Sequence, residues 1–314
     1  MFSIVQVFSL MLACVLPCER SSAQPMWDSQ KKLNKQASYS RRQTDPTVIT
    51  FEYPVEYNLA VQKWIQFFQG NGRRVFSSWL SRSNKYLPAI QKVLVSEGLP
   101  ADLAYMVMIE SGFMPHATSS AKAVGPWQFI NETGERYGLT TNWWLDERRD
   151  FDKSSRAAAK YLKYLHSLFN CWNLAAAGYN AGENKIIRLM DKHQTRSFWQ
   201  LAKISSLATE TKDYVPKLIA TMLIAKAPGI YGFRNVKSQQ PVRFEHFHVP
   251  GGTRLDHLAQ SIGFPPDTMR ELNPELIRGY IPFQVTGRNI RIPHGSSASV
   301  SAFVRKQVST TASM

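Results

Sequence analysis

Cysteine is scarce in this sequence, with three among 314 residues. Two of them, Cys14 and Cys18, lie in an N-terminal stretch that we expect to be removed. Cys171 would then be the only cysteine left, so we expect no intrachain disulfide and no fold that depends on disulfides. A lone cysteine between an asparagine and a tryptophan is predicted to be a small buried hydrophobic residue.

The N-terminus lacks an apolar run long enough for a membrane span. Residues 2–17 are mostly apolar but number only 16, which is short for a transmembrane helix. Ser21 and Ala23 follow at the small-residue positions of a cleavage site, so we interpret 1–23 as a secretory signal, although it lacks the usual leading Lys or Arg. An uncleaved anchor and lipidation at Cys14 or Cys18 stay open as alternatives.

Acidic residues are few, with 23 against 38 basic ones and a net charge of +15. A basic chain favours an anionic partner. For an exported protein we expect no nucleic acid as partner, and an acidic polymer outside the cytoplasm is favoured instead. The length predicts one large domain or two smaller ones.

The texture of the sequence changes along the chain. Polar residues 24–49 predict a linker. Helical periodicity then predicts an N-terminal helical extension over 50–95 and a helical domain over 96–232. Alternating residues near 241–250 and 289–293 enclose two helical patterns, which predicts a small β-α-α-β module over 241–294. The Ser/Thr-rich tail, 295–314, is predicted to be disordered.

Glu110 stands at the end of an apolar run. On a helix it shares a face with Leu103, Met106 and Val107. A carboxyl group on such a face is desolvated, and its pKa should rise, as a general acid requires. Spacing alone leaves a second reading open, in which Glu110 ends the helix and points into water.

Further motifs follow in order: "ESGF" from Glu110, "GPWQF" from Gly125, "AGYNAGE" from Ala177 and "ETKDYVP" from Glu210. Together they resemble the signatures of the lytic transglycosylases of peptidoglycan. "NWWLDERRD" at 142–150 is similar to the branch of membrane-bound lytic murein transglycosylase D. The chain departs from that branch at Pro126, where leucine is usual.

The resemblance implies a mainly α fold with a lysozyme-like transglycosylase domain. It implies cleavage of the MurNAc-GlcNAc β-1,4 bond without water, leaving 1,6-anhydromuramyl ends. A single residue, Glu110, would act first as acid and then as base, and no metal or cofactor is implied. The implied substrate-binding residues are Ser119, Gln128, Tyr179, Asn180 and Glu210.

Some of these residues have ordinary structural alternatives. Tyr179 could be a buried aromatic, and Glu210 could be an acidic residue in the first turn of a helix. Of Phe113, Trp127 and the pair Trp143-Trp144, we expect one or two to offer stacking surfaces for sugars. The charged run 146–150 is predicted to form surface ion pairs.

The C-terminal module, "GGTRLDHLAQSIGFPPDTMRELNP" with "IRIP", resembles a LysM repeat. LysM modules bind glycans that contain N-acetylglucosamine, although a single degenerate copy could be a structural extension instead. His246 and His248 share a strand face, but without a third ligand we expect no metal site.

The family resemblance implies peptidoglycan glycan strands as partner. We expect a monomer in the periplasm, and association with the outer membrane is left open. Two other functions remain: a hydrolytic, lysozyme-like muramidase and an inactive peptidoglycan-binding protein.

Overall fold

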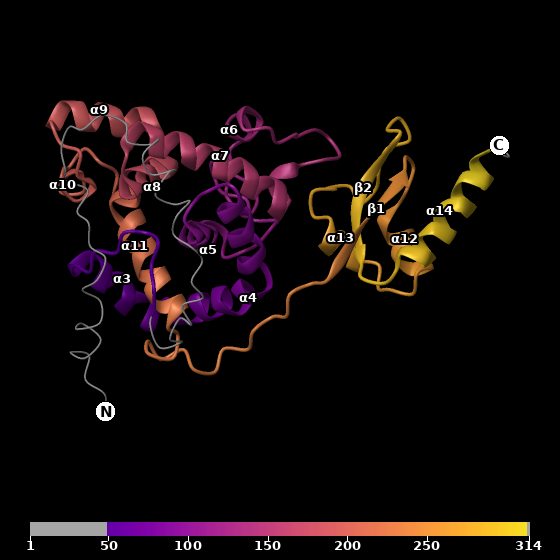
Figure 1. The fold of residues 1–314 in the computed structure, drawn as a ribbon, viewed down its shortest axis with the longest axis horizontal. Coiled ribbons are helices and arrows are strands. Elements are labelled where there is room, and N and C mark those ends of the chain that lie inside the picture. The colour runs from indigo at the N-terminus through magenta and orange to yellow at the C-terminus, as the bar shows by residue number, and fades with distance from the viewer. Residues whose placement is uncertain (1–48, 313–314) are drawn as a thin grey trace, which may run out of the picture. The chain divides into compact units, whose positions relative to one another are not determined.

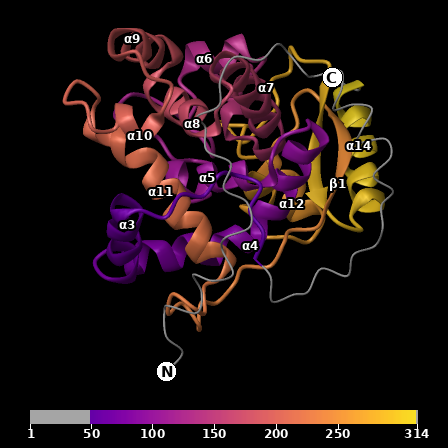
Figure 2. The same ribbon diagram turned by 60° about the vertical axis from the view of Figure 1, so that its left-hand side comes forward.

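A computed structural model describes residues 49–312 of the chain. Two compact units divide it: the first takes in the chain up to residue 66 and residues 164–232, and the second takes in residues 67–163 and 233 to the end. The predicted signal peptide, 1–23, and nearly all of the predicted linker, 24–49, lie outside the described residues. Figures 1 and 2 show the elements from two sides.

The described chain is mostly helical, and the predicted fold class is confirmed. Two strands occur near the C-terminal end of the described chain. The elements in order are α3 (Leu59–Gln69), α4 (Arg73–Ser96), the 3-10 helix η1 (Ala101–Ala104), α5 (Tyr105–Ser111), α6 (Asn131–Arg136), the 3-10 helix η2 (Glu147–Arg149), α7 (Phe151–Phe169), α8 (Trp172–Ala181), α9 (Glu183–His193), α10 (Phe198–Leu201), α11 (Thr209–Lys226), β1 (Phe244–Pro250), α12 (Leu255–Ser261), α13 (Thr268–Leu272), β2 (Gly287–Pro293) and α14 (Ser297–Ala312).

In the first unit, α8 is the central helix, and it contacts α9, α10 and α11. Its residues from Asn173 to Gly178 are all buried. Small side chains allow this close packing: a Cβ at Gly178 would lie 2.8 Å from the Phe169 ring. The alanine-rich sequence before Tyr179 therefore serves to bring neighbouring helices close to this helix.

Cys171, the residue before α8, is buried as predicted. The expectation of no intrachain disulfide concerns a chain without residues 1–23 and stays a prediction. Cys14 and Cys18 lie outside the described residues.

The C-terminal module has the predicted β-α-α-β order. Its strands β1 and β2 pair antiparallel, with Phe244 opposite Pro293 and Val249 opposite Arg288. Alternate strand residues and the inner faces of α12 and α13 form one apolar core, which includes Val249, Leu255, Leu258, Met269, Ile290 and Ile292.

The prediction of a disordered tail over 295–314 is wrong, because Ser297–Ala312 forms helix α14. Val300 is fully buried in the core of the module, and Phe303 and Val304 pack against that core. Glu245 of β1 also accepts hydrogen bonds from the Gly295 amide and from the Ser297 hydroxyl at the start of the helix. Burial of this i, i+3, i+4 apolar set outweighs the polar composition that suggested disorder.

The segment before α7 joins the C-terminal module within the second unit. Trp144 and Leu145 belong to the core of the module. The Asp146 amide donates to the Glu275 carbonyl oxygen at 2.8 Å, and the Ile277 amide donates to the Trp144 carbonyl oxygen at 3.0 Å. The module is therefore packed on this segment, and both share one hydrophobic core.

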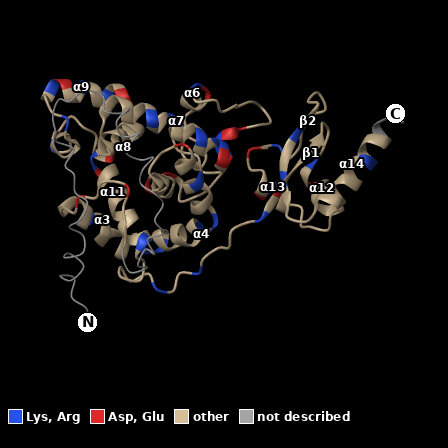
Figure 3. Cartoon of the chain, in the orientation of Figure 1, with Lys and Arg blue, Asp and Glu red and all other residues tan. Residues whose placement is uncertain are grey.

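The charged run 146–150 is buried, which corrects the prediction of surface ion pairs. Asp146, Glu147, Arg148 and Asp150 are each at most 7% exposed. Burial raises the pKa of Glu147, but hydrogen bonds from Lys153 and Arg288 outweigh this effect and hold that pKa below its ordinary value. Other lysines and arginines are spread over several described helices, among them α4, α7 and α9 (Figure 3).

Glu275 should make the stability of the second unit depend on pH. Burial, together with the nearby Asp150 carboxylate, raises the pKa of Glu275 to about 7, against the opposing effect of Arg291 and Arg288. A raised carboxyl pKa stabilises the fold fully below the ordinary value near 4.5, and this contribution is lost as pH rises through about 7. We expect the urea midpoint to fall between pH 5 and pH 8, and Glu275→Gln to reduce this fall.

Glu271→Gln, at an exposed position of α13, is the control and should keep the wild-type pH dependence. A Glu275→Gln protein with an unchanged pH dependence would contradict the prediction.

Candidate active site

Helix α5 carries Glu110 and is buried almost all round. Tyr105 to Ile109 and Ser111 are buried, and Glu110 alone in this helix is partly exposed. The expected single apolar face is therefore too narrow a description, since Leu103 lies in the 3-10 helix η1 and the whole of α5 is core. The backbone that carries Glu110 is therefore part of the core. Glu110 is also the last residue but one of α5, and the alternative in which it ends the helix and points into water stays open.

The end of α5 is fixed by Gly112 and helix α4. Gly112 adopts φ +57°, and its amide donates to the Met108 carbonyl oxygen at 3.1 Å. Arg82 donates from Nε to the Gly112 carbonyl oxygen at 2.5 Å. A cation at a helix C-terminus also complements the helix dipole. These contacts hold the turn that immediately follows Glu110.

Gly112→Ala should destabilise the protein strongly. The new Cβ would lie 2.3 Å from two atoms of the Trp79 indole ring, in a left-handed backbone conformation. We expect a loss of about 2–5 kcal/mol, made up of about 1–2 for the backbone and about 1–3 for overpacking. The measurement is the urea midpoint.

Gly98→Ala is the matched control, because Gly98 has φ +75° but no atom within 4 Å of a new Cβ. It should cost only the backbone part of the loss. Equal losses in the two variants would show that the Trp79 contact is unimportant.

The loop after α5 is held by short β-bridges, Thr118 with Val124 and Val124 with Phe129. Ser119, a predicted substrate-binding residue, lies at one corner and is partly exposed. Its hydroxyl accepts a hydrogen bond from the Ala123 amide at 3.1 Å. Ser119 therefore has a structural role in this loop, whatever else its hydroxyl binds.

Gln128 lies in the same loop with a positive φ of 51°. Its side-chain nitrogen donates to the carbonyl oxygens of Gly125, at 2.8 Å, and Ala117, at 3.2 Å. Two acceptors fix which end of the amide is nitrogen. The loop thus uses both amide hydrogens and leaves the amide oxygen as the acceptor end of the side chain.

Ser111 joins the helix of Glu110 to the loop of Gln128, a role that the sequence reasoning missed. Its hydroxyl lies 2.9 Å from the Pro126 carbonyl oxygen and 3.2 Å from that of Val107. Pro126 contributes only its carbonyl group to this link, so the missing N–H of proline costs nothing here. The motif "ES" was the available signal, but its spacing does not reveal the acceptor.

Arg148 supports the loop from the other side. Its guanidinium is paired with Asp146 at 2.8 and 2.9 Å and reaches the Phe129 carbonyl oxygen at 3.3 Å. The Arg148 carbonyl oxygen would lie only 1.9 Å from a Cβ at Gly125, whose φ is +85°. These contacts were also missed, because a charged run gives no sign of burial in the sequence.

The remaining predicted residues lie in the first unit. Tyr179 and Asn180 are partly exposed near the end of α8, and Glu210 lies in the first turn of α11. Asn180 donates from Nδ2 to Glu210 Oε1 at 3.2 Å and accepts from the Thr211 hydroxyl at 2.8 Å. The structure therefore brings Asn180 and Glu210 together, and Thr211 orients the amide between them.

Most of the candidate stacking aromatics are core residues. Phe113 and Trp127 are fully buried, and Trp144 is 8% exposed. The Trp127 indole donates to the Ser155 hydroxyl at 2.8 Å, which ties the loop to α7. Trp143 is 57% exposed and is the one of the four with a side chain available for stacking.

Among the described residues, no group of three or more His, Cys, Asp or Glu side chains is placed to hold a metal ion. His248 lies 3.2 Å from the side-chain oxygen of Asn289. Within the same described part of the chain, no helix has the length and apolar character to cross a membrane.

Two family models match the chain. Residues 88–202 match the transglycosylase SLT domain, and residues 243–307 match the LysM-like domain of lytic transglycosylase MltD. The second match extends into α14, in agreement with the contribution of that helix to the module core.

Curated relatives include membrane-bound lytic murein transglycosylase D of Escherichia coli K12, with 32% identity over 61% of this chain and 43% of the relative. Membrane-bound lytic murein transglycosylase C of Haemophilus ducreyi is 25% identical over 51% of this chain and 46% of the relative. The chain thus spans less than half the length of these relatives.

A solved structure, the 70 kDa soluble lytic transglycosylase of Escherichia coli, is 16% identical and matches with a TM-score of 0.41 over 57% of this chain and 32% of that protein. The two family matches confirm the resemblance that the motifs suggested. The chain therefore contains a region similar to the transglycosylase SLT domain, followed by a region similar to the LysM-like domain of lytic transglycosylase MltD.

Proposed function

We propose that this protein is a peptidoglycan lytic transglycosylase that cleaves the MurNAc-GlcNAc β-1,4 bond and leaves 1,6-anhydromuramyl ends. The observation that carries the proposal is the setting of Glu110: a partly exposed carboxyl group at the end of a buried helix, inside the region that matches the SLT domain. Most glycosidases need two carboxylates across the scissile bond, whereas this chemistry needs one.

Glu110 first donates its proton to the glycosidic oxygen, and the bond from C1 to that oxygen breaks. The N-acetyl group of the same sugar stabilises the positive charge at C1. The Glu110 carboxylate then takes the proton from the C6 hydroxyl, whose oxygen attacks C1. Glu110 ends protonated again, and no water is consumed. Attack within one molecule has a high effective concentration, which favours it over hydrolysis.

Other residues supply binding in this proposal. The amide oxygen of Gln128 is the end left over after its nitrogen is bound by the loop, and it suits the N–H of an N-acetyl group. Ser119 contributes a hydroxyl to the same group. In the first unit, Tyr179 and the Asn180–Glu210 pair contact the sugar chain.

We also propose an exported protein that works in the periplasm on peptidoglycan strands. The names of the relatives support a membrane-bound envelope protein. The LysM-like domain would bind the same polymer.

Mass spectrometry of the ends released from purified peptidoglycan tests the proposal. Anhydro ends support it. Reducing ends would point to a hydrolytic muramidase, and absence of cleavage would point to a binding protein.

Pro126→Leu should change the rate by less than about tenfold, or about 1.4 kcal/mol in barrier. The link to Ser111 uses the carbonyl group of residue 126, which leucine keeps. The measurement is the initial rate of release of anhydro ends. A gain far above tenfold would mean that proline partly disables the loop.

A further inference from the structure

The C-terminal module is joined to the segment 144–153 by charges as well as by the shared core. Arg288 of β2 donates to Glu147 at 2.9 Å, and Arg291 donates to Asp150 at 2.7 Å. Arg291 also lies 3.5 Å from Glu275. The side chains of Glu147 and Asp150 are 7% and 3% exposed. Because buried charges are costly without partners, these arginines, together with Lys153 beside Glu147, allow the two carboxylates to be buried.

The 3-10 helix η2 connects these ion pairs with the loop after α5 that contains Gln128. Glu147 and Asp150 flank Arg148, and the Arg148 guanidinium reaches the Phe129 carbonyl oxygen and, at 3.4 Å, that of Lys122. The Arg148 carbonyl group also lies against Gly125. Lys122 and Phe129 enclose the part of the loop that contains Gln128. A shift of η2 would therefore move the Arg148 guanidinium and the Arg148 carbonyl group, and both of these contact the loop.

We infer that the LysM-like module is a fixed part of the catalytic framework, and that Arg288 and Arg291 position the Gln128 loop through Arg148. The module then affects catalysis by positioning this loop, as well as by any binding to glycan. The positioning of the loop does not depend on the proposed function. Its effect on substrate rests on the proposed function, because it requires Gln128 to contact the substrate.

A tether and a positioning module predict different results on a short soluble glycan. A tether raises the local concentration of an insoluble polymer and has no effect on a small diffusible fragment. A displaced binding loop weakens binding of any substrate and raises KM. Loss of folded protein lowers the apparent kcat and leaves KM unchanged. Separate values of KM and kcat therefore distinguish loss of a tether, displacement of the loop and loss of folded protein.

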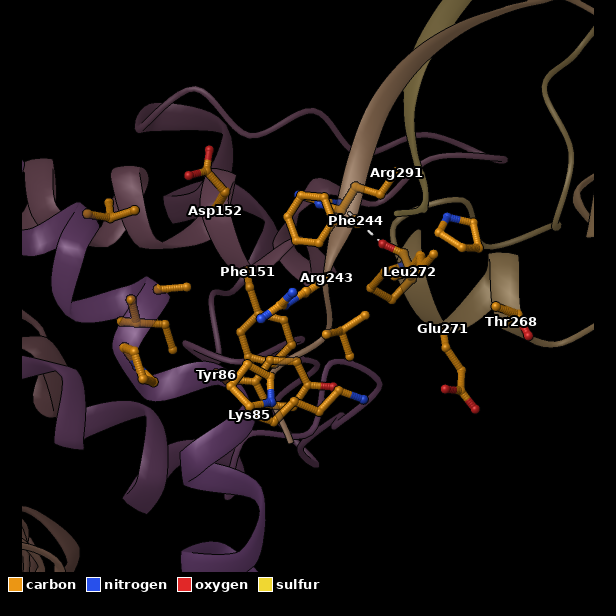
Figure 4. A pocket seen from close by; sticks show the side chains of 18 of the residues that line it. Lys85, Tyr86, Phe151, Asp152, Arg243, Phe244, Thr268, Glu271, Leu272 and Arg291 are labelled. Atoms are coloured by element: carbon orange, nitrogen blue, oxygen red, sulfur yellow. Dashed lines mark hydrogen bonds between the residues drawn. The ribbon is translucent and has the colours of Figure 1, made fainter. Parts of the chain in front are cut away.

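The test variant is Arg288→Gln with Arg291→Gln in the full chain. Both arginines line a cavity of about 300 Å³, and Arg291 also lines one of about 570 Å³ beside Phe151 and Phe244. Figure 4 shows the second cavity, with the hydrogen bond from Arg291 to the Leu272 carbonyl oxygen. These spaces give room for the shorter side chains and for water. The control, Arg270→Gln with Arg305→Gln, removes the same charge from exposed positions of the module.

Amide hydrogen exchange measures the stability of the module junction and of the loop in one experiment. The Asp146 and Ile277 amides report on the junction with the module, and the Val124 and Gly125 amides report on the loop. We expect both pairs to exchange at least tenfold faster in the test variant and at the wild-type rate in the control. On a soluble peptidoglycan tetrasaccharide we expect KM to rise at least threefold, with a smaller change in kcat.

Three outcomes would overturn the inference. The first is faster exchange at Asp146 and Ile277 with an unchanged loop. The second is unchanged exchange at both places, and the third is a fall in apparent kcat at constant KM. If the double variant fails to fold, the same exchange rates and kinetic constants are measured for Arg291→Lys, which keeps the charge. A wild-type protein that releases no anhydro ends from purified peptidoglycan would refute the proposed function, and the exchange data would still decide the positioning.

Discussion

Glu110→Gln should lower the rate of peptidoglycan cleavage at least about a thousandfold, within the usual range for a general acid. Glutamine keeps the shape of the side chain but can neither donate a proton to the glycosidic oxygen nor take one from the C6 hydroxyl. Glu110 is partly exposed on a helix that is otherwise buried, so the change should leave the fold and the binding of glycan intact. Release of anhydro ends, followed by mass spectrometry, gives the rate.

Glu132→Gln is the control, because Glu132 is an exposed carboxylate in the same unit, and its ion pair with Arg136 is a long i, i+4 contact at 3.7 Å. It should keep the wild-type rate. A Glu110→Gln protein with a tenth or more of the wild-type activity would show that another group is the acid. Loss of peptidoglycan binding in the same variant would show that glutamine disturbs the site as well as the chemistry.

Gly125→Ala should cost both stability and most of the activity, although it removes no functional group. The new Cβ would lie 1.9 Å from the backbone oxygen of Arg148, and the backbone conformation has φ +85°. A clash with backbone is not relieved by rotation of a side chain. We expect a loss of stability of about 1–2 kcal/mol for the conformation and about 1–3 kcal/mol more for overpacking, together with loss of most activity.

Gly138→Ala separates the two causes, because Gly138 has φ +91° and open space around a new Cβ. The urea midpoint and the cleavage rate are measured for both variants. Gly138→Ala should lose only the conformational part and keep its activity. An active Gly125→Ala protein would mean that the loop can move away from Arg148 without harm to the site.

Sequence patterns predicted local structure well where neighbours in the chain decide it. Helical periodicity identified the helical domain, and alternation with turn residues identified the β-α-α-β module. The motifs around Glu110, Gln128 and Tyr179 pointed to the family because their order and residue types are specific. For Ser119, Gln128, Tyr179, Asn180 and Glu210 the contact with substrate stays a prediction.

Two wrong predictions have one physical origin. The sequence predicts surface ion pairs over 146–150 and a disordered tail, and both segments are buried or ordered in the fold. In each case the deciding partner is distant in sequence or not visible in the local pattern. Asp150 is buried beside Arg291, 141 residues later, and Glu147 is buried between the nearby Lys153 and the distant Arg288. The tail is helical because Val300 fills the core of the module.

The sequence by itself thus identified the candidate residues, because a carboxyl group, an amide and the order of the motifs are local properties. Tertiary structure decided how these groups are held. Only the folded chain shows Ser111 joined to Pro126, Gln128 oriented by two carbonyl oxygens and Arg148 supporting the loop from a buried turn. Burial and the pairing of charge depend on which distant segments meet, and a charged residue looks the same in the sequence whether it faces water or a partner.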